Sequence, residues 1–188
     1  MPDEVLTPDG DARPVAGFFG KLSATGDFVW RGLPDAFRKH WDGWLTRHIA
    51  PLQRDGHSFP ERHLRFRLPS GGRLAAGVIL PSQDSAGRQF PLSLLLIANG
   101  DMSQAQIDPW CDAALQLSPE ALSPDDLWRA LDALPAPTPQ GPATGPMQIW
   151  TSGHPPLTTR AEDPDNALRK LLPPVLSLIH ISEPTRPY

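Results

Sequence analysis

The sequence predicts an α/β protein of the α+β type, in which helices cover a central, mainly antiparallel sheet within a single domain. Two short apolar runs, 74–80 and 92–97, lack polar alternation, which is typical of strands buried on both faces. Short connections between consecutive strands favour antiparallel pairing. Apolar residues over 37–52 recur at helical spacing, which predicts an amphipathic helix. With 188 residues and 39% hydrophobic content, the chain suits one core rather than two.

The chain begins its predicted structure with two short aromatic runs, 17–22 and 27–30, which we expect to form a hairpin around the turn residues between them. Gly17 and Gly20 lie inside the first run, where glycine weakens a regular strand. They indicate that another segment approaches this backbone closely.

A helix is predicted next, with Pro34 at its first position, where a missing N–H donor costs nothing. Trp41 and Trp44 belong to its apolar stripe, and we interpret them as core residues rather than as a partner-binding surface. Pro51 indicates that the helix bends or breaks before its end.

Residues 63–68 alternate strictly between apolar and polar side chains, which predicts a strand. The alternation places the apolar side chains toward the core and Arg65 and Arg67 outward. The two central strands follow, and they are joined by an ordered loop, because Pro81 cannot donate to a strand ladder and Pro91 keeps the preceding residue out of the helical region.

The second half of the chain alternates helices with turns. Residues 104–117 predict a helix interrupted by Pro109, and Ser123 caps a second helix that begins with Pro124 and two acidic residues. The proline-rich segment 135–146 is predicted to be a surface loop rather than a core element. Residues 147–151 are predicted to return as a last strand.

The two ends of the chain are set apart from the domain, which we expect to span 15–175. Residues 1–14 contain proline, aspartate and glycine without periodicity and are predicted to be a loose leader. Residues 176–188 match the translation of a transposase sequencing adapter, so we leave them out of functional reasoning, as one would an expression scar.

Composition excludes several classes of partner. The net charge of −4, with acidic and basic residues mixed along the chain, gives no electrostatic indication of binding to nucleic acid or to an anionic membrane. No run approaches the ~20 apolar residues that a membrane-spanning helix needs, so we predict no membrane insertion. The single cysteine, Cys111, is predicted to be a buried small hydrophobic residue and makes no internal disulfide.

His57 and His63 match no zinc-ligand spacing, so we predict neither a metal site nor a cofactor. We expect a cytoplasmic protein.

Four charged residues form the candidate site: Asp27, Arg31, Asp84 and Arg88. We expect them to meet where the first hairpin approaches the loop between the central strands. The cluster is either a recognition surface or a structural network in which Arg88 satisfies loop carbonyls and a carboxylate. Nothing in the sequence indicates a cleft in which two carboxylates act as a hydrolase, so no catalytic residue is predicted.

Two signatures in this order carry a family resemblance. They are Gly17-Phe18-Phe19-Gly20-Lys21-Leu22 with Gly26-Asp27-Phe28-Val29-Trp30-Arg31-Gly32-Leu33-Pro34 and the tryptophan-rich helix, and then Pro81-Ser82-x-Asp84-x-x-Gly87-Arg88-x-Phe90-Pro91-Leu92. Together they resemble the TagF family, also called ImpM, of bacterial type VI secretion. The resemblance covers about 17–150.

The resemblance implies a function that the residues alone do not show. It implies a non-catalytic, cytoplasmic, post-translational regulator that represses secretion assembly by binding the forkhead-associated scaffold protein of the system. Two alternatives stay open. The first is a hydrolase or phosphatase that uses Asp27 and Asp84 with Arg88, and the second is a structural subunit of the secretion apparatus.

Overall fold

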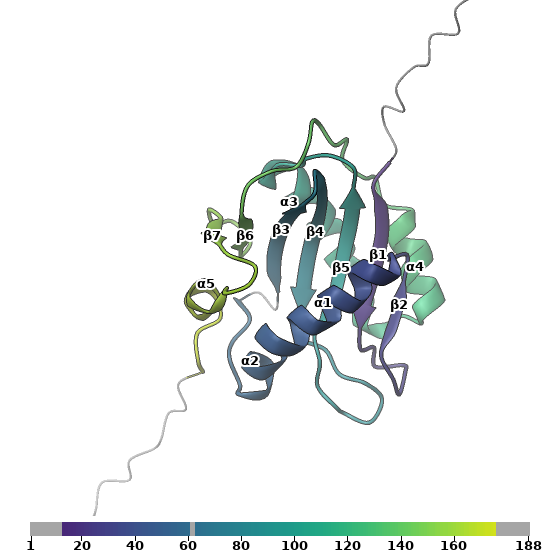
Figure 1. Cartoon of the computed structure of the whole chain (residues 1–188). Coiled ribbons are helices and arrows are strands. Elements are labelled where there is room, and N and C mark those ends of the chain that lie inside the picture. The colour runs from purple at the N-terminus through teal and green to yellow at the C-terminus, as the bar shows by residue number, and fades with distance from the viewer. Residues whose placement is uncertain (1–12, 61–62, 176–188) are drawn as a thin grey trace, which may run out of the picture.

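The computed structural model describes residues 13–60 and 63–175, and these residues form one seven-stranded sheet between helical layers (Figure 1). The strand order is β2-β1-β5-β4-β3-β6-β7, and every neighbouring pair is antiparallel. The strands are β1 (Val15–Gly20), β2 (Val29–Arg31), β3 (Leu64–Ser70), β4 (Arg73–Leu80), β5 (Leu92–Ala98), β6 (Met147–Trp150) and β7 (Leu157–Thr159). The predicted α+β architecture is therefore confirmed.

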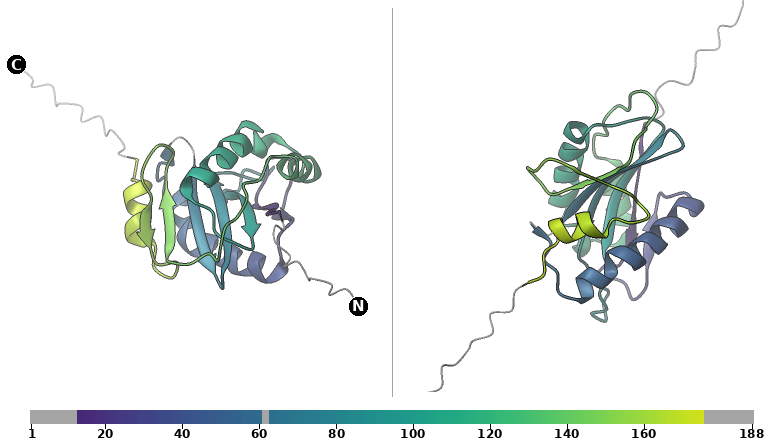
Figure 2. Two further views of the ribbon diagram at one scale, coloured as in Figure 1. Left: turned by 90° about the horizontal axis from the view of Figure 1, so that it is seen from above. Right: turned by 60° about the vertical axis from the view of Figure 1, so that its left-hand side comes forward.

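Helices lie on both faces of this sheet (Figures 1 and 2). They are α1 (Asp35–His48), α2 (Ala50–Arg54), α3 (Gln104–Gln116), α4 (Pro124–Asp132) and α5 (Asp165–Leu171), with a short 3-10 turn at Pro119–Ala121. One apolar layer joins α3 and α4 to the sheet, and the other joins α1, α2 and α5 to its opposite face. Among the described residues, no helix has the length and apolar content that crossing a bilayer requires.

The central strands β4 and β5 are paired, as predicted, and every residue of β5 has a partner in β4. All seven residues of β5 are buried, because both faces of the sheet are covered. Each fully buried leucine or isoleucine side chain stabilises the fold by roughly 1.5–3 kcal/mol. Glycine is required at position 77 by packing, because a Cβ atom on Gly77 would lie 2.0 Å from the carbonyl oxygen of Leu94. The two strands can approach this closely only with glycine at that position.

The tryptophan stripe of α1 belongs to the core, as predicted. Trp41 is fully buried, and its Nε1 donates to Ser93 Oγ over 2.9 Å. Trp44 packs beside it, with the ring centroids 5.0 Å apart. The predicted break is also present, because α1 ends before Ile49 and Pro51 lies in the first turn of α2. Pro34, predicted at the first helical position, is instead the residue that precedes the helix.

Helix α3 runs through Pro109 without the predicted interruption. Proline removes only one backbone hydrogen bond here, and the helix is held by a capping box between Ser103 and Gln106 and by a buried apolar face. Cys111 lies on that face, as predicted, and burial raises the pKa of its thiol. The predicted helix after Ser123 is confirmed, because the Ser123 side chain caps α4.

The prediction for the two arginines of β3 is wrong. Arg65 is 1% exposed and Arg67 is 9% exposed, because α3 and the segment before it cover the face on which they lie. Arg65 pairs with Asp108 over 2.7 Å and with Asp112, one turn further along α3. Trp150 Nε1 donates to the same Asp108 over 2.9 Å. We call Arg65, Asp108, Asp112 and Trp150 the Arg65 cluster.

The C-terminal part contains more structure than the sequence indicated. The strand predicted at 147–151 is β6, but it is not the last, since β7 and α5 follow it. Segment 135–146 has no helix or strand, yet its Ala143 is buried and pairs with Gly72. The predicted leader lies outside the described residues except for Arg13 and Pro14, and so does the adapter-like segment 176–188.

Candidate functional site

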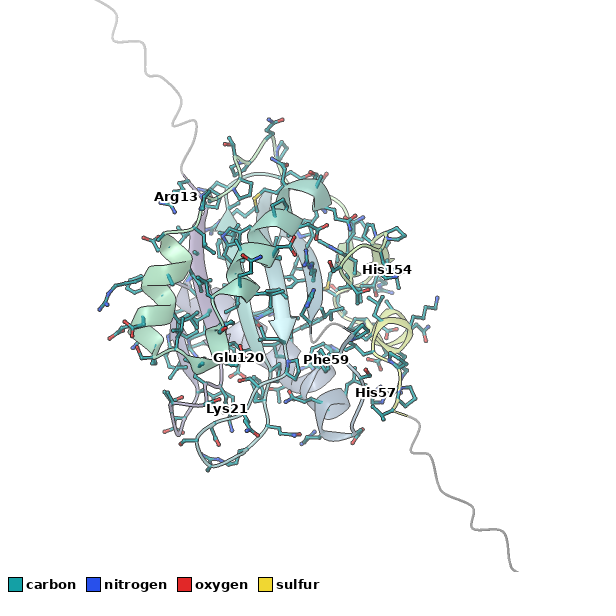
Figure 3. All side chains as sticks on the ribbon, turned by 180° about the vertical axis from the view of Figure 1, so that it is seen from behind. Arg13, Lys21, His57, Phe59, Glu120 and His154 are labelled. Atoms are coloured by element: carbon teal, nitrogen blue, oxygen red, sulfur yellow. The ribbon has the colours of Figure 1, made fainter. Side chains whose placement is uncertain are left out.

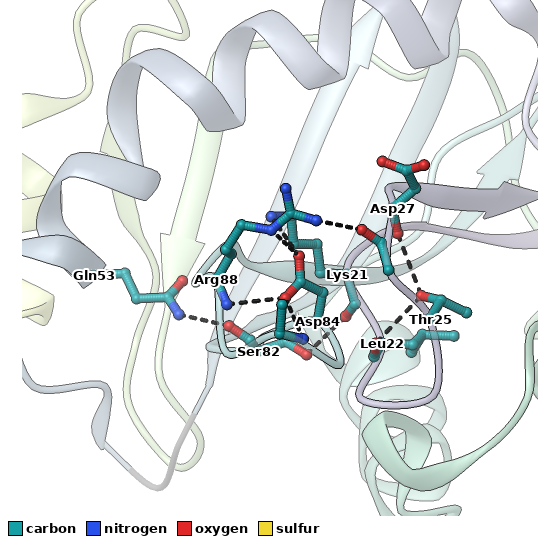
Figure 4. Close-up of polar contacts among 10 residues, drawn as sticks. Lys21, Leu22, Thr25, Asp27, Gln53, Ser82, Asp84 and Arg88 are labelled. Atoms are coloured by element: carbon teal, nitrogen blue, oxygen red, sulfur yellow. Dashed lines mark hydrogen bonds and ion pairs between the residues drawn. The ribbon is translucent and has the colours of Figure 1, made fainter.

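The predicted meeting of the first hairpin and the central loop is present in the structure. The loop between β4 and β5 folds against the turn between β1 and β2, where the backbone N–H of Ser85 donates to the Thr25 oxygen over 2.8 Å. The Arg88 guanidinium donates to the oxygen of Gly26 in the same turn (Figure 4). Residues about 60 positions apart in the chain are thereby joined.

Asp84 is the centre of this junction. Its carboxylate is buried and accepts four hydrogen bonds (Figure 4). Oδ1 accepts from the backbone N–H groups of Ala86 and Arg88 over 3.0 and 2.9 Å. Oδ2 accepts from Lys21 Nζ over 3.0 Å and from Arg88 Nε over 2.8 Å. A carboxylate offers about four acceptor positions, so these donors occupy its whole capacity.

These contacts set the protonation of Asp84. Burial by itself raises the pKa of a carboxyl group, because it disfavours the charged form. The donors from Arg88, Lys21 and Ala86 outweigh burial and lower the pKa of Asp84 from 3.8 to about 2. Asp84 is therefore a charged anchor at neutral pH and a weak base.

Lys21 completes the site, and it was not among the predicted site residues. It directly follows β1 and is 7% exposed, and its Nζ lies 5.0 Å from the centroid of the Phe28 ring. The Ser82 hydroxyl donates to the Lys21 backbone oxygen over 2.7 Å, which ties the same two segments together. A lysine directly after a buried strand was the available signal, because such a side chain needs a counter-charge. Figure 3 shows Lys21 below the sheet. We call Lys21, Asp84 and Arg88 the Asp84 cluster.

Aromatic side chains and a glycine support this cluster. Phe90 contacts the rings of Phe28 and Phe19 edge to face, with centroids 4.8 and 6.1 Å apart. Gly20 lies against the loop so closely that a Cβ atom would be 2.2 Å from the Pro91 oxygen. Its φ of 145° also disfavours any other residue. The predicted close approach at this glycine is confirmed.

The other two predicted site residues lie apart from Asp84. Arg31 pairs with Asp125 at the start of α4, with its Nε 3.2 Å from Oδ1. Asp27 is exposed, and within the described residues its carboxylate makes no hydrogen bond or ion pair (Figure 4). The structure thus brings together Asp84 and Arg88 and separates them from Arg31, because β2 directs Arg31 toward α4.

The contacts of the Asp84 cluster hold the loop between β4 and β5 against the turn between β1 and β2, and we therefore call it a clamp. Its buried carboxylate has no acceptor position left for a substrate, while the Arg88 side chain is 62% exposed and can contact a partner. Within 13–60 and 63–175, no three histidine, cysteine, aspartate or glutamate side chains are grouped so that they could hold a metal ion.

The fold and the clamp define an α+β domain in which a hairpin is joined to the central loop of an antiparallel sheet by one buried aspartate. The model of the TagF N-terminal domain, described as type VI secretion system-associated, matches residues 17–134. The chain therefore belongs to this type VI secretion-associated family. The match begins within β1, extends past the end of α4, and contains every residue of the Asp84 cluster.

A solved structure supports the assignment of the fold. The crystal structure of PA0076 from Pseudomonas aeruginosa PAO1 is similar to this chain, with 28% sequence identity and a TM-score of 0.50. The similarity covers 74% of this chain and 72% of that one. No curated protein matches the sequence.

Proposed function

We propose that this protein is a non-catalytic, cytoplasmic regulator that represses type VI secretion assembly by binding the forkhead-associated scaffold protein of the system. Membership of the TagF family is the observation that carries this proposal. The scaffold as partner is what the family resemblance implies.

The geometry of the Asp84 cluster supports binding over catalysis. A general base needs a free lone pair and a pKa near the working pH. Asp84 has all four acceptor positions filled and a pKa of about 2. Asp27 extends into solvent away from it, so the two carboxylates do not face a common substrate position (Figure 4).

The binding proposal is tested with the full chain and the scaffold. We expect the tagged protein to retain the scaffold in a pull-down, and deletion of its gene to increase secretion. If the scaffold is not retained and deletion does not increase secretion, the proposed regulatory function is refuted. Co-sedimentation with assembled sheath or baseplate, without scaffold binding, would favour a structural subunit instead.

The non-catalytic part of the proposal has its own test. Purified protein is incubated with phosphothreonine peptides, and phosphate release is compared between wild type and Asp84→Asn. We expect release equal to that of buffer in both samples. Release by wild type that the substitution abolishes would establish the hydrolase instead.

A further inference from the structure

Most of the exposed large apolar side chains in the described part of the domain lie along the β1–β2 side of the sheet. Of the five among the described residues, four lie on β1, β2 and α4 or on the turn before β2: Val15, Phe28, Trp30 and Trp128. Trp128 is 41% exposed and Val15 is 52% exposed. Figure 1 shows β2 and α4 beside each other at this edge. Two of them, Val15 and Trp128, line the same hollow, whereas Trp30 stacks on Arg38 and Phe28 packs on Phe90. Adjoining exposed apolar groups on a globular protein mark an interaction site.

A hollow of about 410 Å³ lies in this region, between the start of β1, the end of β5 and the N-terminal end of α1. Its lining residues are Arg13, Val15, Gly32, Leu33, Pro34, Arg73, Ile97, Asn99 and Trp128. The volume falls within the range of roughly 300–1,000 Å³ that is usual for ligand sites. We call it the Trp128 hollow.

The Trp128 side chain forms one wall of this hollow. Its indole packs on Gly32, where an added Cβ atom would lie 2.8 Å from the indole Nε1. Gly32 has a φ of 73°, which glycine adopts readily, so the turn brings the indole against the backbone. A partly exposed tryptophan that packs on the backbone is the kind of residue that dominates binding energy at interfaces.

The hollow is positively charged. Its lining contains two arginines, Arg13 and Arg73, and no carboxylate. Arg13 donates to the backbone oxygens of Asp132 and Leu134 at the end of α4, which holds its side chain there without neutralising its charge. Arg73 is exposed and has no ion-pair partner within the described part of the chain.

We propose that the Trp128 hollow binds an acidic segment of the partner protein. An apolar side chain of that segment packs on Trp128, and its carboxylates pair with Arg13 and Arg73. The two arginines favour an acidic ligand in different ways. The exposed guanidinium of Arg73 can match a carboxylate bidentately, whereas Nη2 of Arg13 already donates to two backbone oxygens, so Arg13 pairs with a carboxylate through its remaining N–H groups. The inference rests on the proposed scaffold binding and names the face that performs it.

The first experiment compares the affinity of full-chain variants for the purified scaffold by isothermal titration calorimetry. Trp128→Ala and Arg73→Glu are each expected to weaken binding at least about tenfold, as expected for hot-spot residues. Two matched controls are expected to leave the affinity unchanged. Trp30→Ala removes an equally exposed tryptophan that stacks on Arg38 outside the hollow, and Arg54→Glu reverses an exposed charge on α2.

The outcomes separate this inference from the proposed function. Scaffold binding that the hollow variants and the controls retain equally would overturn the hollow as the binding face and leave the regulator intact. If wild type does not bind the scaffold, the proposed function fails, and a second probe decides the inference.

The second probe is a short synthetic peptide of alternating glutamate and phenylalanine, and its control carries lysine in place of glutamate. We expect the acidic peptide alone to shift the indole N–H resonance of Trp128, assigned through Trp128→Ala. No shift would overturn the inference. Two other results would also overturn it. In the first, the full chain does not bind the peptide, while deletion of residues 1–12 shifts the indole N–H resonance of Trp128. In the second, the protein is a dimer in solution and Trp128→Ala dissociates it.

Discussion

Two clusters of buried ion pairs hold this domain together, and they have opposite charges at their centres. In the Asp84 cluster a buried carboxylate is surrounded by Lys21 and Arg88. In the Arg65 cluster a buried guanidinium is surrounded by Asp108 and Asp112. The first fastens a loop to a hairpin, and the second fastens α3 to the sheet.

The two clusters differ in how exposed the partner side chains are when the central residue is substituted. The Lys21 side chain is 9% exposed, so without Asp84 its charge has neither a counter-charge nor full hydration. The Asp108 and Asp112 side chains are 28% and 58% exposed, so without Arg65 both can turn to water. Breaking a buried pair is costly mainly because of the unpaired charge that remains. The exposure of the partners therefore decides how sensitive each cluster is.

Asp84→Ala is expected to give the largest effect. It leaves Lys21 unpaired and also removes the acceptor of the backbone N–H groups of Ala86 and Arg88. We expect the urea midpoint to fall further than for substitution of Arg65, the centre of the other cluster. Asp27→Ala, in the adjoining turn, is the control and should stay within about 0.5 kcal/mol of wild type. Equal midpoints for the two variants would show that Asp84 is not the anchor.

Substitutions of Arg65 are expected to have a smaller effect that depends on the volume of the new side chain. Arg65→Ala should cost about 2–4 kcal/mol, because it removes a large buried side chain and leaves a cavity. Arg65→Met should cost less than about 1.5 kcal/mol, since methionine fills most of the volume and the carboxylates become hydrated. Both are measured by urea unfolding, with Arg129→Ala as an exposed control on α4. A cost for Arg65→Met equal to that for Arg65→Ala would mean that charge, not volume, dominates.

The two clusters also differ in how far the sequence predicted them. Asp84 and Arg88 lie in a loop bounded by Pro81 and Pro91 and beside a glycine-rich hairpin, and these local signals were sufficient to predict the junction. The central strands were predictable for a similar reason, because an apolar run without alternation requires two covered faces.

The Arg65 cluster could not be predicted in the same way. An alternating strand shows which residues share a face, but it does not show whether a helix covers the polar face. Asp108 and Asp112 are one helical turn apart on α3, and only the packing of α3 over β3 turns them into partners of Arg65. Lys21 was missed for the same reason, since its counter-charge comes from a distant loop.

The two clusters are expected to differ in how their contribution to stability depends on pH. This difference can be tested with the smallest change to the structure. The pKa of Asp84 is lowered to about 2 from 3.8, so its stabilisation is complete above about pH 4. As pH falls, the unfolded chain takes up the proton first, and the contribution is lost progressively down to about pH 2. Burial lowers the pKa of Arg65, but its bonds to Asp112 and Asp108 outweigh burial and raise it.

Arg65 therefore keeps its charge in both states throughout the acid range, and its own titration adds no slope there. Urea midpoints between about pH 5 and about pH 2 should fall less steeply for Asp84→Asn than for wild type. Arg65→Met, measured in the same buffers, should show the same fall of the urea midpoint with decreasing pH as wild type, because Asp84 is still present. An Asp84→Asn slope equal to that of wild type would show that the carboxylate carries no charge-dependent stabilisation, and the distinction between the two centres would fail.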